Sequence, residues 1–309
     1  MTLALTSPLR IGTRSSPLAL AQAEMTKAAL LAAHGWNEAA VVLVPMLSSG
    51  DKIQDRPLAE IGGKALWTKE LERALLTHEI DIAVHSMKDV ETVRASIFGI
   101  VAMLPRADVR DRLIGAESIA ALAQGAKVGT SSPRRAAQLK ALRPDITTES
   151  IRGNVATRLS KVENGDFDAT LLAAAGLARL GQGNIGTAIE MTEMLPAASQ
   201  GAIGIDCLVE RTEIAALMAP INHQETFDCV MAERAFLEAL GGTCHSPVAA
   251  QAVWQGDILT LKGEILRDDG SERQQAAIAC KPGDHLAPAM LARQLLDAAS
   301  PELRALFEG

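Results

Sequence analysis

Short apolar runs alternate with longer stretches of helical periodicity in the first third of the chain. Residues 9–11, 41–47 and 80–85 are apolar enough for strands, the last of them buried. Residues 17–34 and 68–77 have the spacing of helices that present one apolar face. Strands that alternate with helices are typical of an α/β fold with a largely parallel sheet.

The same order of elements recurs in the middle of the chain. The sequence GTRSSP at residues 12–17 follows the first strand, and GTSSPRR at residues 129–135 follows a short strand at 127–128, with a helix expected to about Leu142. The sequence IDIA at residues 80–83 is echoed by FDAT at residues 167–170. This repetition predicts two α/β lobes of similar design.

The C-terminal part has a different pattern. Crossovers between the lobes are expected near residues 104–106 and 195–197, and such a double connection suits closure around a ligand. Beyond them we expect a helix at 227–240, a glycine-rich loop at 241–247, strands at 249–254, 258–266 and 273–279, and a helix near 288–298. The pattern predicts a first domain of residues 1–104 and 197–218, a second of 105–196, and a small α+β third domain of 219–309.

Composition narrows the classes of function. The 309 residues carry a net charge of −7, no Tyr and only 3% aromatic residues, which argues against a nucleic-acid partner. The four cysteines form no CxxC pair, a usage typical of a reducing cytosol rather than of a disulfide framework or zinc site. Residues 1–20 lack the apolar run of a secretory signal, and no window could span a bilayer. We therefore expect a cytoplasmic protein without a membrane partner, and nothing in the sequence demands more than a monomer.

The two Ser-Ser-Pro turns are candidate anion sites. Ser16 and Ser132 are predicted helix caps, and a helix N-terminus attracts carboxylate or phosphate. Arg14 in the first turn, and Arg134 with Arg135 in the second, add guanidinium groups that can bind carboxylates through two hydrogen bonds. The alternative is ordinary capping beside solvated arginines.

Three more arginines lie near turns of the second lobe. Arg152 and Arg158 flank the start of a predicted helix, and Arg179 follows the end of an expected strand at 173–176. They are surface residues unless the fold brings them together, in which case they indicate a cleft for a ligand with several carboxylates or phosphates. No P-loop or dinucleotide fingerprint accompanies them.

The sequence HSMKD at residues 85–89 follows a predicted buried strand. Asp89 is placed to act as an acid or base or to stabilise a cation, and Lys88 could form a Schiff base. The alternative is a Lys–Asp pair on a polar loop. Cys244 lies on a glycine-rich loop where a thiol could be exposed, and the alternative is an unreactive thiol, which is the commoner case for a single cysteine. The other cysteines, Cys207, Cys229 and Cys280, have the setting of inert packing residues.

Seven blocks of the sequence, taken in order, resemble the porphobilinogen deaminase family. They are residues 11–19, the segment 50–64, residues 85–90, 129–135, 152–159, 195–202 and 242–247. The resemblance runs from about residue 9 to residue 250 and is thinner beyond. Glu91 stands where the family usually has Pro, and Trp67 where Phe is usual.

The resemblance implies an α/β protein with two lobes similar to type II periplasmic binding proteins and a small α+β C-terminal domain. It implies a dipyrromethane cofactor joined to Cys244 by a thioether. It also implies that four porphobilinogen molecules lose ammonia in turn and condense to hydroxymethylbilane, in the biosynthesis of haem, chlorophyll or cobalamin. The polar segment at 48–64 would be a lid that excludes water.

Site residues follow from the same resemblance. Asp89, ionised and buried beside arginines, and Lys88 are the expected catalytic residues, and no metal is expected. The cofactor is expected to contact Cys244, Asp89, Lys88, Ser86, Thr130, Ser132, Arg134, Arg135, Arg152 and Gly153, and the substrate Arg14, Ser16, Arg152, Arg158, Arg179, Lys64, Trp67, Gln200 and Gly201.

Two rival functions explain part of the pattern. A solute-binding or effector-sensing protein on the same scaffold would use the arginines and the double connection but would not need Asp89 or Cys244. A lyase that forms a Schiff base would use Lys88 instead.

Overall fold

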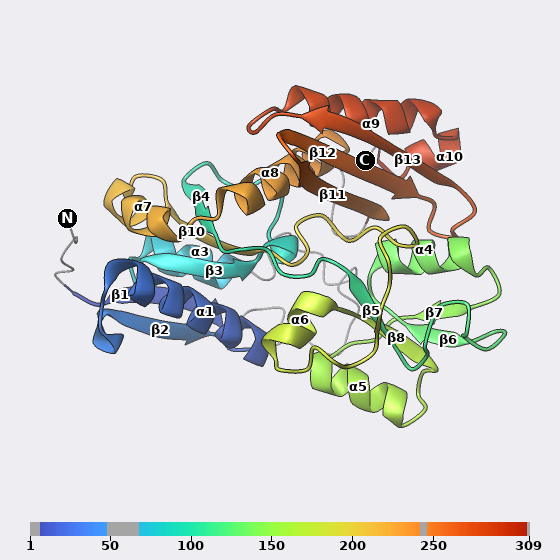
Figure 1. Ribbon diagram of the computed structural model, residues 1–309, viewed down its shortest axis with the longest axis horizontal. Helices are drawn as coiled ribbons and strands as arrows, with labels where there is room; N and C mark the ends of the chain where they lie inside the picture. The colour runs from blue at the N-terminus through green and yellow to red at the C-terminus, as the bar shows by residue number, and fades with distance from the viewer. Residues whose placement is uncertain (1–6, 48–67, 242–245, 308–309) are drawn as a thin grey trace. The chain divides into compact units, whose positions relative to one another are not determined.

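The computed structural model of the chain describes residues 7–47, 68–241 and 246–307 (Figure 1). The chain divides into two compact units, one of Met1–Ala107 with Gly201–Phe227 and the other of Asp108–Gln200 with Asp228–Gly309. The chain therefore leaves the first unit near residue 107 and returns to it near residue 201. The finer division into three domains stays a prediction.

A five-stranded mixed sheet forms the centre of the first unit. Its order is β2-β1-β3-β10-β4, in which β1 runs parallel to β2 and β3, while β10 is antiparallel to β3 and β4. The strands are β1 (Leu9–Arg14), β2 (Val41–Met46), β3 (Ile82–Ser86), β4 (Phe98–Met103) and β10 (Ile203–Leu208).

Helices cover both faces of this sheet because its strands are apolar on both sides. Ile82 and Val84 pack in a cluster with α1 (Pro17–His34) and α7 (Thr212–Met218), whereas Ala83 packs with α3 (Lys69–Leu76). Successive side chains of a strand point to opposite faces, so α1 and α7 lie on one face and α3 on the other. Short 3-10 helices occur at Glu38–Ala40, Met87–Asp89 and Ala219–Ile221.

The second unit contains a sheet of the same design. Its order is β7-β6-β8-β5-β9, with β6 parallel to β7 and β8, and β5 antiparallel to β8 and β9. The strands are β5 (Asp111–Ile114), β6 (Lys127–Gly129), β7 (Thr147–Glu149), β8 (Ala169–Ala173) and β9 (Thr187–Ala188), and the helices are α4 (Pro133–Leu142), α5 (Val155–Glu163) and α6 (Ala174–Arg179).

The structure confirms that the two lobes repeat one design. Where β3 begins, the Asp81 carboxylate accepts a hydrogen bond from the Arg10 backbone N–H at 2.9 Å. Where β8 begins, the Asp168 carboxylate accepts one from the Lys127 backbone N–H at 2.7 Å. The short echo between residues 80–83 and 167–170 therefore has a structural cause, since each aspartate joins the central strand to its neighbour.

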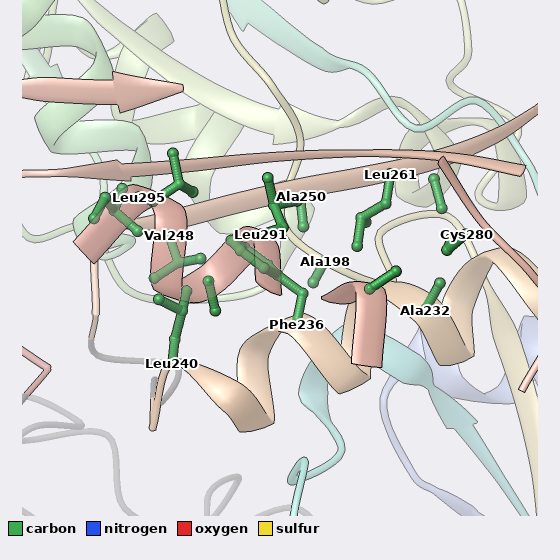
Figure 2. Packing of buried hydrophobic residues seen from close by; sticks show 14 of the residues in the cluster. Ala198, Ala232, Phe236, Leu240, Val248, Ala250, Leu261, Cys280, Leu291 and Leu295 are labelled. Carbon is green, nitrogen blue, oxygen red and sulfur yellow. The ribbon is translucent and has the colours of Figure 1, made fainter. Parts of the chain in front are cut away.

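A three-stranded antiparallel sheet completes the second unit, with helices α8 and α9 on one of its faces (Figures 1 and 2). Phe236 of α8 and Leu291 of α9 lie in one apolar cluster with Leu261 and Ile265 of the sheet. The elements are α8 (Gln224–Ala239), β11 (Val248–Gln255), β12 (Ile258–Leu266), β13 (Arg273–Cys280), α9 (Leu286–Ala298) and α10 (Pro301–Arg304). The expected α/β lobes and small α+β part are confirmed.

Two expected boundaries are wrong. The first strand was expected at residues 9–11 with Arg14 in the following turn, but β1 continues to Arg14, because it pairs with β2 over its whole length. Residues 174–176 were expected in a strand before Arg179, but β8 ends at Ala173 and these residues begin α6. Small residues Ala174, Ala175 and Gly176 are buried in that helix, and a short apolar run does not distinguish a buried helical turn from a strand. Among the described residues, no helix is long and apolar enough to cross a membrane.

Candidate active site and cofactor site

The HSMKD segment follows the end of β3 in the first unit and forms a 3-10 turn there. This turn lines a pocket that faces the start of α1, where Ser16 caps the helix by accepting a hydrogen bond from the Ala19 N–H at 3.3 Å. The pocket is lined by Arg14, Ser16, Leu18, Ala19, Gln22, Thr68, Val84, His85, Ser86, Asp89 and Val90. Four predicted site residues therefore line one pocket. They are Arg14 and Ser16, expected to contact substrate, Ser86, expected to contact the cofactor, and Asp89, expected to be catalytic.

Asp89 differs from expectation in its exposure. It was expected to be buried beside arginines, but it is exposed at the pocket, while Met87 fills the core beneath the turn. A three-residue helical turn explains this, because only one of its side chains can face the core. Lys88 is half-buried and does not line the pocket.

A buried ionic network lies behind the pocket. The His85 ring Nε2 is 2.8 Å from Asp206 Oδ1, and Arg94 Nη1 is 2.6 Å from Asp206 Oδ2. Arg94 also pairs with Glu72 at 3.0 Å. Burial alone would raise the pKa of Asp206, but the charges of His85 and Arg94 outweigh it and hold that pKa below its ordinary value. The network fixes the ring that forms part of the pocket wall.

Two pocket residues were missed by the sequence reasoning. Gln22 on α1 is 2% exposed, and its Nε2 has no hydrogen-bond partner among the described residues. A buried donor of this kind is costly unless a ligand or water accepts from it. Thr68 is buried at the start of α3, and its hydroxyl donates to Glu91 at 3.1 Å. The spacing of Gln22 four residues after Leu18, which also lines the pocket, was the available signal, since residues at this spacing lie on the same face of a helix.

The arginine pair of the second unit is buried around one carboxylate. Arg134 and Arg135 are 3% and 6% exposed, which excludes the alternative of solvated arginines. Arg134 Nη2 donates to Asp111 Oδ2 at 2.8 Å, and Arg135 Nη2 donates to Asp111 Oδ1 at 2.6 Å. Burial alone would raise the pKa of Asp111, but the two guanidinium charges outweigh it and hold that pKa well below its usual range.

The other terminal nitrogens of the pair are also used inside the protein. Arg134 Nη1 donates to Gln138 Oε1 and to the Leu195 carbonyl, both at 2.8 Å. Arg135 Nη1 donates to the Leu171 carbonyl at 2.8 Å. The sequence suggested that these planar groups grip a ligand through two terminal nitrogens, whereas the structure uses those nitrogens to hold the arginines in place.

The second Ser-Ser-Pro turn still has N–H donors and a net positive charge that a ligand could use. The Nε atoms of Arg134 and Arg135 are buried and have no hydrogen-bond partner among the described residues. Ser132 caps α4 by accepting from the Arg135 N–H at 3.4 Å, and Thr130 lies buried just before it. Two guanidinium groups around one carboxylate leave one positive charge uncompensated within this group. Orphaned N–H groups and unbalanced positive charge suit an acidic ligand.

Gln200 is buried rather than open to a substrate. Its Nε2 donates to Asp111 Oδ1 at 2.9 Å and to the Val109 carbonyl at 2.7 Å. It is therefore part of the surroundings of the arginine pair, and its expected contact with substrate stays a prediction. Gly201 is buried and has φ +84°, at the point where the chain returns to the first unit.

The other three arginines predicted as site residues lie at or near the ends of α5 and α6 or on α5. Arg152 is partly buried, and Gly153 beside it has φ +112° with no room for a Cβ, which would lie 2.6 Å from Thr157. Arg158 Nε donates to the Gly153 carbonyl at 3.0 Å. Burial lowers the pKa of Arg179 to about 10, so it remains a cation at neutral pH. The pocket in the first unit includes none of these residues.

Three expected site residues, Lys64, Trp67 and Cys244, lie outside the described residues, as does the predicted lid at 48–64. The remaining cysteines are buried, as expected for packing residues, and burial raises the pKa of Cys207 to about 11. In residues 7–47, 68–241 and 246–307, no group of three or more His, Cys, Asp or Glu side chains is placed to hold a metal ion.

Comparison with known families accounts for nearly the whole chain. A family profile described as "Porphobilinogen deaminase, dipyromethane cofactor binding domain" matches residues 9–216, and one described as "Porphobilinogen deaminase, C-terminal domain" matches residues 227–295. The chain belongs to the porphobilinogen deaminase family. It is 56% identical to a porphobilinogen deaminase of Sphingopyxis alaskensis over 97% of each chain, and 52% identical to one of Paracoccus denitrificans over 86% of each chain.

Solved structures that align with part of this chain include periplasmic binding proteins. A TRAP periplasmic solute binding protein from Desulfovibrio salexigens aligns with 72% of this chain and 74% of its own, at 11% identity and a TM-score of 0.42. The periplasmic aliphatic sulphonate binding protein SsuA from Escherichia coli aligns with 76% of this chain and 71% of its own, at 17% identity and a TM-score of 0.39.

Proposed function

We propose that the chain is a porphobilinogen deaminase, a transferase that condenses four porphobilinogen molecules to hydroxymethylbilane with release of ammonia. The observation that carries this proposal is the pocket of the first unit, where an exposed carboxylate, Asp89, lines the same pocket as Arg14 and the capped helix start at Ser16. Porphobilinogen carries two carboxylates and a basic aminomethyl group. The pocket therefore offers a partner for each kind of charge.

The dipyrromethane cofactor fits the arginine turn of the second unit. A dipyrromethane carries acetate and propionate groups, and buried Nε donors beside net positive charge are suited to receive them. Residues Cys244, Ser86, Lys88, Asp89, Thr130, Ser132, Arg134, Arg135, Arg152 and Gly153 would hold it, with Cys244 as the covalent anchor. When bound, the cofactor supplies the pyrrole α-carbon from which the chain of rings grows.

Asp89 is proposed to act at the reacting centre. An ionised carboxylate near the pyrrole nitrogens stabilises the cation that forms as ammonia leaves, and it accepts or relays the proton released after the rings join. Lys88 assists by its charge, and the chemistry needs no imine. His85, held by Asp206, supports the turn from behind.

Substrate carboxylates are proposed to bind to cations and helix starts. The proposed contacts are Arg14, Ser16, Lys64, Trp67, Arg152, Arg158, Arg179, Gln200 and Gly201. We further propose that residues 219–309 form a third domain that carries the cofactor cysteine, that the segment 48–64 acts as a lid, and that the protein works as a cytoplasmic monomer. Cysteines kept as free thiols support the reducing compartment.

The intact mass of the purified protein tests the cofactor and its anchor. The native chain should exceed its sequence mass of 32.6 kDa by two linked pyrrole units, and Cys244→Ser should show the bare chain. Cys229→Ser is the matched control, because that thiol is buried and should leave the added mass in place.

A bare native chain would be incubated with porphobilinogen to separate two explanations. An apoenzyme releases ammonia as it gains the covalent mass, because each ring that is attached loses its amino group. A chain that binds porphobilinogen without gaining mass is a binding protein, and that result would overturn the proposed function.

A further inference from the structure

The sheet of the C-terminal part carries a buried carboxylate on the face away from its apolar core. Ile265 of β12 packs in the core with Phe236 and Leu291, so its neighbour Glu264 points to the opposite face. Glu264 is nonetheless 0% exposed. Its Oε2 accepts hydrogen bonds from Arg273 at 2.7 and 3.0 Å. A buried carboxylate on the outer face of a small sheet needs an explanation beyond the stability of the sheet.

That carboxylate is joined to the arginine pair through one amide. Gln138 Nε2 donates to Glu264 Oε1 at 2.8 Å, and Gln138 Oε1 accepts from Arg134 Nη1 at 2.8 Å. A carboxylate can only accept and a guanidinium can only donate, so the Gln138 amide has one favourable orientation between them. Glu264 thereby orients the Gln138 amide so that its oxygen faces Arg134, although Glu264 and Arg134 lie on different elements of the second unit.

The crossing segment at residues 195–200 provides a second connection. Ala198 lies in the apolar core of the small sheet (Figure 2), and the Ser199 N–H donates to Glu233 Oε2 on α8 at 2.6 Å. The segment then contacts the arginine site at both ends, since the Leu195 carbonyl accepts from Arg134 and Gln200 donates to Asp111. Both connections run from the C-terminal sheet and its helices to the same pair of guanidinium groups.

Backbone packing supports the same coupling. The turn between β12 and β13 lies so close to α4 that a Cβ on Gly270 would be 2.4 Å from the Ala141 nitrogen. Gly270 also has φ +72°, a conformation that other residues adopt at a cost. The hairpin that carries Glu264 therefore packs directly against the helix that carries the arginines.

We propose that Glu264, acting through Gln138, is a positioning residue for Arg134, so that the C-terminal sheet orients the arginine pair as well as supporting the fold. The inference rests on the proposed role of that pair in holding the cofactor. The apolar core of the sheet would form without Glu264, because the carboxylate lies on its other face. The orientation of Arg134 would not be held in the same way, because Gln138 Nε2 would keep only the Leu195 carbonyl at 3.0 Å and lose the charged acceptor at 2.8 Å.

Five variants test this proposal: Glu264→Leu, Gln138→Leu, these two changes combined, Glu264→Gln and Ile265→Ala. The last is the matched control, since it removes packing from the core of the same strand without contacting Gln138. For each variant, the fraction of chains with the covalent cofactor mass and the unfolding midpoint are measured on the purified protein. KM and kcat are then measured on the loaded fraction.

We expect Glu264→Leu and Gln138→Leu to lower the loaded fraction several-fold, with the double variant no worse than either single change. Glu264→Gln should restore loading, because its amide oxygen can still accept from Gln138. Ile265→Ala should lower the unfolding midpoint while its folded chains load normally.

Loading that follows the unfolding midpoint across all five variants would overturn the positioning role. A native chain without any covalent mass after incubation with porphobilinogen would instead count against the proposed function itself. The two failures are therefore distinguishable.

Discussion

Asp89→Asn is expected to lower kcat by about 10²–10⁴-fold, because general acid–base and charge-stabilising groups contribute on that scale. Asparagine keeps the volume and hydrogen-bonding reach of the side chain but carries no charge and takes up no proton. Asp89 is exposed at the pocket, so its replacement should leave the unfolding midpoint nearly unchanged. Ammonia release and hydroxymethylbilane formation would be followed under steady-state and single-turnover conditions.

Glu79→Gln is the matched control for the loss of one carboxylate charge. Glu79 pairs with Arg73 on the surface of the same unit, before β3 begins, and lies outside the pocket. It should retain native turnover. If Asp89→Asn also turned over at the native rate, the role assigned to Asp89 would be wrong, whatever the family.

Asp111→Ala is expected to have the largest effect on stability. It leaves two buried guanidinium groups without the carboxylate that joins them, and breaking a buried ion pair in this way costs about 3–5 kcal/mol. Asp111 lies 23 residues from Arg134 in the chain, so local structure cannot replace it. Urea unfolding followed by circular dichroism would give the change, and intact mass would show whether the surviving folded chains carry cofactor.

An apolar triple variant separates stability from cofactor binding. Replacing Asp111 by Leu and both arginines by Met removes all three charges together, which for a buried triad is often neutral or stabilising. We therefore expect a folded chain with little or no covalent cofactor. A triple variant that loaded normally would contradict the proposed role of the arginine pair.

The lowered pKa of Asp111 predicts how the stability of the native chain depends on pH. Because the pKa of Asp111 is lowered in the folded chain, its stabilisation is complete above the ordinary aspartate pKa of about 4 and is lost as pH falls below it. The triple variant lacks this group and should lose less stability in acid than the native chain.

Local chemistry made much of the molecule predictable from its sequence. Ser16 and Ser132 were expected to cap helices, and both do, because a hydroxyl before Pro at the first helical position satisfies the free N–H groups of its own helix. The repeated lobes were visible because Asp81 and Asp168 each bond to a strand that the sequence also repeats. The ordered motifs around Arg14 and Asp89 identified the family, and the structure brings both residues to one pocket.

The sequence by itself therefore determined the caps, most of the strands, the repeat and four of the residues that line the pocket, namely Arg14, Ser16, Ser86 and Asp89. Only the tertiary structure decided what holds the site in place. Asp111, Asp206 and Glu264 each look like an isolated acid in a strand, and none has a local pattern that names its partner. Glu264 meets Gln138 from 126 residues away, and such a partner is chosen by the packing of distant elements. These partners affect stability because the groups are buried, and an unpaired charge or amide costs free energy only where water is excluded.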